Sequence, residues 1–302
     1  MKIFKFLRHN FGMVVGFLIV LIFAVVAIAA PKIIPVQDPD DPYALPKESY
    51  GITPKPPSEE HPLGLMENQG DILYGLIWGT RWAFLMSLLV ALGRTLIGGI
   101  IGIISGYYGR FLDSILMRIT DAFLAFPLMA AVLIMLTLFG GGLIGIQTGS
   151  AEQILIIALI AFGWMGHARL IRGNVLLEKN QEYVQAAITL GANSRRIIFK
   201  HILPNTYQGL IVLITSDIGS IVVWMAVFSF LGFSGTQPTA DWGKMVNNSR
   251  NWIVSAPATA LKYWYTFIPP SLAIIMFSFG WNLIGDGLRN LLDPKISKNQ
   301  NS

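Results

Sequence analysis

The chain lacks cysteine and is poor in charged residues. Of its 302 residues, 13% are charged and 53% are hydrophobic, with a net charge of +5. Soluble domains usually carry about 25% charged residues, so this shortage indicates an integral membrane protein. The absence of cysteine excludes disulfides and thiolate metal sites, although it does not fix the redox compartment.

Common catalytic signatures are also missing. There is no G-x-x-x-x-G-K-[ST] sequence, and the only Gly-Lys pair, Gly243-Lys244, is followed by methionine, so no P-loop for ATP is predicted. The four histidines show no H-E-x-x-H spacing, and no G-x-S-x-G sequence is present. We therefore expect no catalytic residue, no metal site and no cofactor in this chain, and no nucleic-acid partner. If ATP supplies energy, another subunit must bind it.

Six apolar stretches approach the roughly 20 residues that a bilayer-crossing helix needs. They lie at about residues 11–30, 82–107, 122–139, 153–168, 209–231 and 263–284. The sequence thus predicts an all-α integral membrane fold with six transmembrane helices and, since no repeat of 20–50 residues is evident, a single membrane domain. Glycines from Gly93 to Gly109 include small-xxx-small spacings, which favour close helix packing within this chain or against a partner.

The first stretch allows a second interpretation, because its basic start and Ala27-Ile28-Ala29 near its end are also typical of a signal peptide. Its apolar run of about 20 residues exceeds the usual 7–15 of a signal core, which favours an uncleaved anchor.

Basic residues indicate the orientation. With six spans, most of them fall on the side of the N-terminus, which the positive-inside rule makes the cytoplasm: Lys2, Lys5, Arg8, Arg110, Arg118, Arg169, Arg172, Lys179, Arg195, Arg196, Lys200, Arg289, Lys295 and Lys298. The proline-rich loop 31–79 falls outside and carries eight acidic residues against three lysines. It is either a solvated connector or a surface for an external partner.

The predicted organisation follows from these spans. It is a cytoplasmic N-terminus (1–10), a first span (11–30), the extracytoplasmic proline-rich loop (31–79), a membrane core (80–290) with a cytoplasmic loop at 169–206, and a cytoplasmic tail (291–302).

Residues 182–205, which we call the elbow, form a polar, basic segment between two apolar runs. The small pair Ala186-Ala187 allows another surface to approach closely. Gly191 suits the left-handed position just past a helix end. Asn193 or Ser194 can cap the next short helix, and Pro204 is expected to stop it. The sequence predicts a helix, a sharp turn and a second helix, with the turn pointing away from the bilayer.

The elbow resembles the cytoplasmic coupling signature of ATP-binding cassette (ABC) importer permeases, which reads E-A-A, three residues, Gly, nine residues, I-x-L-P. The spacing is reproduced by Gln185-Ala186-Ala187, Gly191 and His201-Ile202-Leu203-Pro204, with Gln185 in place of Glu and His201 in place of Ile. Other motifs resemble the C-type permease subunits of oligopeptide and dipeptide importers: His61-Pro62-Leu63-Gly64, Gly106-Tyr107-Tyr108-Gly109, Leu124-Ala125-Phe126-Pro127, Ser229-Phe230-Leu231-Gly232 and Gly285-Asp286-Gly287-Leu288-Arg289. The resemblance covers nearly everything from His61 onward.

The resemblance implies a type I ABC importer permease fold in a bacterial or archaeal plasma membrane, with both termini cytoplasmic. It also implies a heterodimer with a second permease, two ATPase subunits that bind ATP and Mg, and an external solute-binding protein. The chain would form half of a pathway for peptides, although relatives also carry nickel, glutathione or oligosaccharides, and it would not be an enzyme itself. The expected contacts with the ATPases are Glu182, Gln185, Ala186, Ala187, Gly191, Arg195, Arg196, His201 and Pro204.

Two charges lie inside predicted spans. Arg94 is 13 residues past Arg81 and Asp217 is 17 past Lys200, so at ~1.5 Å per residue their depths overlap. A charge there costs at least ~2.5–3.5 kcal/mol and normally faces protein or water. We expect Arg94 and Asp217 to pair beside the pathway; the alternative is that Arg94 snorkels or pairs with the partner subunit. Asn282 is a third pathway candidate, although an interhelical hydrogen bond is its more ordinary role.

Two other functional classes stay open. A secondary transporter driven by an ion gradient often contains inverted repeats, and the elbow has no second copy. A membrane scaffold that transports nothing is the other alternative. The sequence predicts no role for residues 255–266.

Overall fold

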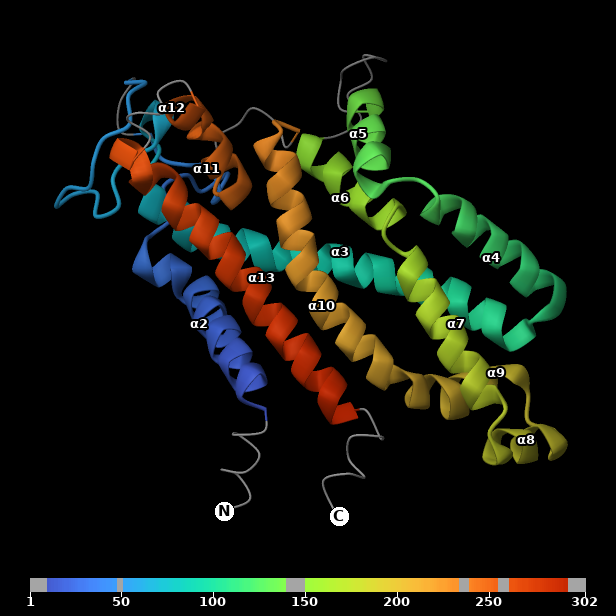
Figure 1. Ribbon diagram of the computed structural model, residues 1–302. Coiled ribbons are helices and arrows are strands. Elements are labelled where there is room, and N and C mark those ends of the chain that lie inside the picture. The colour runs from blue at the N-terminus through green and yellow to red at the C-terminus, as the bar shows by residue number, and fades with distance from the viewer. Residues whose placement is uncertain (1–9, 48–50, 140–149, 234–238, 255–260, 293–302) are drawn as a thin grey trace, which may run out of the picture. The chain divides into compact units, whose positions relative to one another are not determined.

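The computed structural model describes residues 10–47, 51–139, 150–233, 239–254 and 261–292 (Figure 1). Predictions that concern residues 1–9, 255–260 and 293–302 lie outside these ranges. The described residues form helices and no strands, in agreement with the predicted all-α class. The helices are α2 (Phe11–Ile33), α3 (Ile72–Tyr108), α4 (Arg110–Leu124), α5 (Leu128–Phe139), α6 (Ala151–Ala161), α7 (Met165–Lys179), α8 (Glu182–Thr189), α9 (Ser194–Arg196), α10 (Leu203–Phe230), α11 (Trp242–Asn248), α12 (Arg250–Val254) and α13 (Trp264–Leu292), with the short segments η1 (Glu67–Gln69) and η2 (Ile197–Ile202).

Within the described ranges, five helical segments are long and apolar enough to cross a membrane, or six if α4 and α5 count as one broken span. The third span predicted near 122–139 falls on the bent pair α4 and α5, between which the chain turns by 82°. Pro127 explains the break: it lacks a backbone N–H and disfavours helical backbone in the preceding residue. The second span is also longer than predicted, since α3 begins at Ile72.

The chain divides into two compact units, and the first comprises residues 1–88, 150–155 and 218–283. Aromatic rings form much of its core. The Phe277 ring of α13 lies 5.5 Å from that of Phe23 in α2 and 4.9 Å from that of Phe84 in α3, and Trp242 of α11 joins the same cluster. Such tilted and edge-on pairs stabilise helix packing beyond the burial of their area.

The proline-rich loop belongs to this first unit. Part of it packs against the rest of the unit: Leu45, Leu65 and Met66 are buried, and isolated backbone bridges join Ala44 to Thr239 and Lys55 to Leu65. Residues 72–79 of the predicted loop belong to α3. The loop is therefore more than a solvated connector.

The second unit comprises residues 89–149, 156–217 and 284–302. In it α4 packs along α7 (Figure 1), and α3 approaches α7 closely. A Cβ atom at Gly98 would lie 2.5 Å from the His167 Cβ, so glycine is needed at this contact. The small-residue spacing of α3 thus serves packing within the chain.

Candidate functional site

The turn of the elbow is closed by its own backbone. Gly191 has a φ of +81°, its N–H donates to the Ile188 carbonyl at 2.9 Å, and the Ala192 N–H donates to the Ala187 carbonyl at 3.0 Å. This pair of bonds is a Schellman motif, which satisfies carbonyls at the end of α8. The Asn193 side chain then accepts from the Arg196 N–H at 2.9 Å and caps α9. The predicted helix, turn and helix are confirmed.

The expected stop at Pro204 is wrong. The π-helical segment η2 passes directly into α10, and Pro204 is the second residue of that helix. Proline is tolerated in the first turn of a helix, where its missing N–H removes few hydrogen bonds. The wider π turn before it lets the helical path continue from the elbow into α10 without a break.

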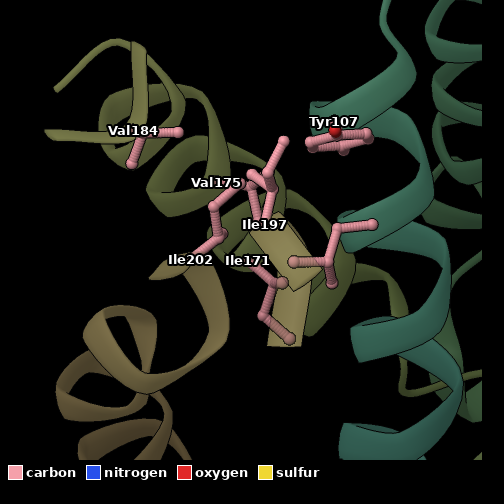
Figure 2. Close-up of a cluster of buried hydrophobic side chains, with 7 residues drawn as sticks. Tyr107, Ile171, Val175, Val184, Ile197 and Ile202 are labelled. Carbon is pink, nitrogen blue, oxygen red and sulfur yellow. The ribbon is translucent and has the colours of Figure 1, made fainter. Parts of the chain in front are cut away.

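A buried apolar cluster joins the elbow to α7 and to the end of α3 (Figure 2). Its members come from four elements: Ile171 and Val175 of α7, Val184 of α8, Ile197, Ile198 and Ile202 of η2, and Tyr107 at the end of α3. Full burial of each aliphatic side chain contributes roughly 1.5–3 kcal/mol. The elbow is consequently a packed body and not a flexible tether.

A group of polar side chains, which we call the polar hub, connects the start of α8 to the segment 201–205 at the other end of the elbow. The Tyr183 hydroxyl donates to the Glu178 carboxylate at 2.6 Å, while the Asn205 amide donates both to that hydroxyl and to the His201 carbonyl, each at 2.7 Å. Burial, with the neighbouring Glu178, raises the pKa of Tyr183. The sequence analysis singled out none of Tyr183, Glu178 and Asn205 for this role.

Gln185 makes a hydrogen bond that explains why glutamine stands here in place of the glutamate of the coupling signature. Its amide Nε2 donates to the Lys179 carbonyl at 2.8 Å, one of the carbonyls that the end of α7 leaves without an intrahelical partner. A glutamate carboxylate only accepts hydrogen bonds and could not make this contact.

The outer surface of the elbow combines apolar and basic groups. Leu190 is 87% exposed and Phe199 is 68% exposed. The other exposed residues include Glu182, Gln185, Ala186, Gly191, Arg195 and Arg196, whereas Ala187 and His201 are half-buried. Exposed apolar side chains grouped with charges are typical of protein-binding surfaces.

The expected pair between Arg94 and Asp217 is present. The Arg94 guanidinium donates to the Asp217 carboxylate at 2.8 Å and to the Leu159 carbonyl at 2.8 Å, and Arg94 is only 4% exposed. His167, which the sequence did not single out, places its Nε2 3.6 Å from the other Asp217 oxygen. Gly163 makes room for the guanidinium, because a Cβ there would collide with it.

Asn282 belongs to the first unit, whereas Arg94 and Asp217 belong to the second. Its amide donates to the Ser278 hydroxyl of the same helix at 3.4 Å. Within the described ranges, no three His, Asp or Glu side chains are grouped so as to hold a metal ion.

Comparison with known proteins gives consistent matches. The profile of the family described as "binding-protein-dependent transport system inner membrane component" matches residues 98–298. The chain is 33% identical to the dipeptide transport system permease protein DppC of Alkalihalophilus pseudofirmus, over 97% of this chain and 89% of that protein. It is 35% identical to the oligopeptide transport system permease protein OppC of Bacillus subtilis (96% and 88%). It is 32% identical to the glutathione transport system permease protein GsiD of Pectobacterium atrosepticum (97% and 89%).

Among solved structures, the chain is similar to the inward-facing MetNI methionine ABC transporter. The TM-score is 0.52 at 18% identity, with 72% of this chain and 97% of that chain covered. This likeness supports the type I permease fold. The chain belongs to the family of binding-protein-dependent transport system inner membrane components and is a multi-pass ABC transporter permease.

Proposed function

We propose that this chain forms half of the translocation pathway of a peptide importer and that its elbow receives the force of ATP hydrolysis from separate ATPase subunits. The observation that carries the coupling role is the elbow itself, a packed, internally bonded body with Leu190 and Phe199 exposed on its surface. The peptide substrate rests on the relatives, whose names refer to dipeptides, oligopeptides and the tripeptide glutathione.

The proposed assembly contains a second permease, two ATPases and an external solute-binding protein. The positive-inside rule supports a cytoplasmic elbow and cytoplasmic termini. When ATP binding closes the ATPases, the elbow would move with them and switch the pathway between inward-open and outward-open states. Such switching needs a packed element with two discrete positions, and the buried cluster supplies the packing.

The buried pair of Arg94 and Asp217 would hold α3 and α10 together beside the pathway. A charge pair in an apolar span faces protein or water, and each partner lowers the cost of burying the other. The pair thus allows a pathway wall that admits polar solutes without leaving an isolated charge in the membrane.

Affinity purification of the tagged chain tests the coupling role. The native chain should retain its ATPases, and Leu190→Asp or Phe199→Asp should release them. Val254→Asp is the matched control, because Val254 is 66% exposed and lies outside the elbow. Retention of the ATPases by both elbow variants would contradict the proposal. Uptake of a dipeptide that survives ATP depletion and follows an ion gradient would favour a secondary transporter instead.

A further inference from the structure

The corner between α3 and α4 is tied to α7 by an unusually complete ion pair. The Arg172 guanidinium grips the Asp113 carboxylate with two parallel bonds, Nε to Oδ1 at 2.5 Å and Nη2 to Oδ2 at 2.6 Å. The Ser105 hydroxyl of α3 donates to the same carboxylate. Bidentate pairs of this kind fix orientation as well as distance. One carboxylate therefore joins α3, α4 and α7.

A second tie lies at the end of α7. The Lys179 ammonium donates to the Tyr107 carbonyl at 2.6 Å and sits 5.3 Å from the centre of the Tyr107 ring. That ring also belongs to the buried apolar cluster of the elbow (Figure 2). Arg172 and Lys179 are seven residues apart, about two helical turns. Two attachment points along one helix prevent it from pivoting about either.

The corner itself is held in a restricted conformation. Gly109 and Arg110 both have positive φ values, +62° and +47°. A positive φ is unfavourable for a residue such as arginine and persists only where the surroundings determine it. The Asp113 N–H donates a hydrogen bond to the Gly109 carbonyl at 3.2 Å. Asp113, whose carboxylate binds Arg172 of α7, therefore also stabilises the turn between α3 and α4.

We infer that Asp113 and Arg172 are positioning residues that make the elbow, α7 and the α3–α4 corner move as one lever. This inference rests on the proposed function, because a lever is needed only if ATPases drive the elbow. It assigns force transmission to a pair outside the elbow. Without the pair, α7 could yield at the corner while the elbow follows the ATPases.

The same two helices provide a matched control. Arg169 of α7 pairs with Asp121 of α4 at 2.5 Å, but these side chains are 54% and 57% exposed, against 33% and 20% for Arg172 and Asp113. Exposed pairs contribute little to stability and impose little geometry. Asp121→Asn should leave the lever intact.

Paired spin labels test the lever in the purified transporter with its ATPases. The chain has no cysteine, so Lys200→Cys, at an exposed elbow position outside the expected ATPase contacts, and Ser114→Cys on α4 give two unique sites. The distance between the labels should be the same in the nucleotide-free and the ATP–vanadate-trapped states. Asp113→Asn and the charge-conserving Arg172→Lys should shift and broaden the distribution on trapping, while Asp121→Asn should not.

A shift on trapping in the native background, or an equal response of Asp113→Asn and Asp121→Asn, would overturn the inference. If the Asp113 variant fails to assemble, Arg172→Lys alone decides, since it keeps the charge and removes only the bidentate geometry. Failure of the proposed function has a different signature: no ATPase would accompany the native chain through purification.

Discussion

Arg94 and Asp217 lie 123 positions apart in the sequence and meet at 2.8 Å, with His167 beside them. Their side chains are 5% and 14% exposed. Because both side chains are buried, each charge stabilises the other. Removal of one partner leaves the other as an uncompensated charge in a medium that solvates it poorly.

The first prediction concerns this dependence. Arg94→Leu or Asp217→Leu alone should destabilise the chain by ~3–5 kcal/mol, whereas the double variant should recover much of that loss because no uncompensated charge remains. The measurement is the midpoint of thermal aggregation of the purified transporter. A double variant no more stable than the worse single variant would argue against direct pairing.

A second prediction isolates the backbone of the elbow turn. A Cβ atom at Gly191 would meet nothing within 4 Å, so only its φ of +81° resists substitution. Gly191→Val should cost ~1–2 kcal/mol because a branched residue disfavours left-handed backbone. Asparagine adopts that conformation more readily, so Gly191→Asn should retain more ATPase on purification. Equal losses in both variants would point to a steric role instead.

The third prediction tests why glutamine occupies position 185. Gln185→Glu replaces the donor to the Lys179 carbonyl with an acceptor, so the junction of α7 and α8 should lose ~0.5–1.5 kcal/mol. Amide hydrogen exchange between residues 180 and 185 should become faster. Gln181→Glu, a neighbouring exposed position, serves as the control and should not change the exchange rates there.

The fourth prediction follows from a buried carboxyl in the other unit. Asp241 accepts from the Gly243 N–H at 2.8 Å and the Ser229 hydroxyl at 2.6 Å. Burial raises the pKa of Asp241, although the bond from Ser229 and the charge of Lys244 oppose the rise. The folded state thus holds this proton more tightly than the unfolded state does. The contribution of Asp241 to stability is greatest below its unfolded pKa of about 3.9 and declines as pH rises through the folded pKa.

Asp241→Asn removes this titration and keeps an oxygen that can accept from Gly243. The thermal midpoint of the native protein should therefore fall relative to that of the variant as pH rises from about 4 to about 8. A difference between the two midpoints that stays constant over this range would show that the carboxyl is not perturbed.

Local chemistry allowed much of the elbow to be predicted. The turn at Gly191 and the cap at Asn193 depend on a few neighbouring residues, and both are present. The continuation of the helix through Pro204 is not predictable, because the π segment before it cannot be recognised from residue types alone. The bend at Pro127 is not evident either, because an apolar run continues on both sides of it.

Contacts that depend on tertiary closure were harder to predict. Arg94 and Asp217 were paired from depth alone, because charges are rare inside spans. The link from Arg172 to Asp113 crosses 59 positions, and nothing local distinguishes it from the exposed pair of Arg169 and Asp121. The hub at Tyr183 forms only once α8 and the start of α10 are brought together.

The most direct test of the account is the side of the membrane on which the elbow lies and what covers it. A single cysteine at Leu190, which is 87% exposed, can be introduced into this cysteine-free chain. A membrane-impermeant maleimide should label it in inside-out vesicles stripped of ATPases, less when the ATPases are bound, and not in intact cells. Labelling in intact cells, or labelling in vesicles that the ATPases leave unchanged, would contradict the assignment of the elbow as the coupling element.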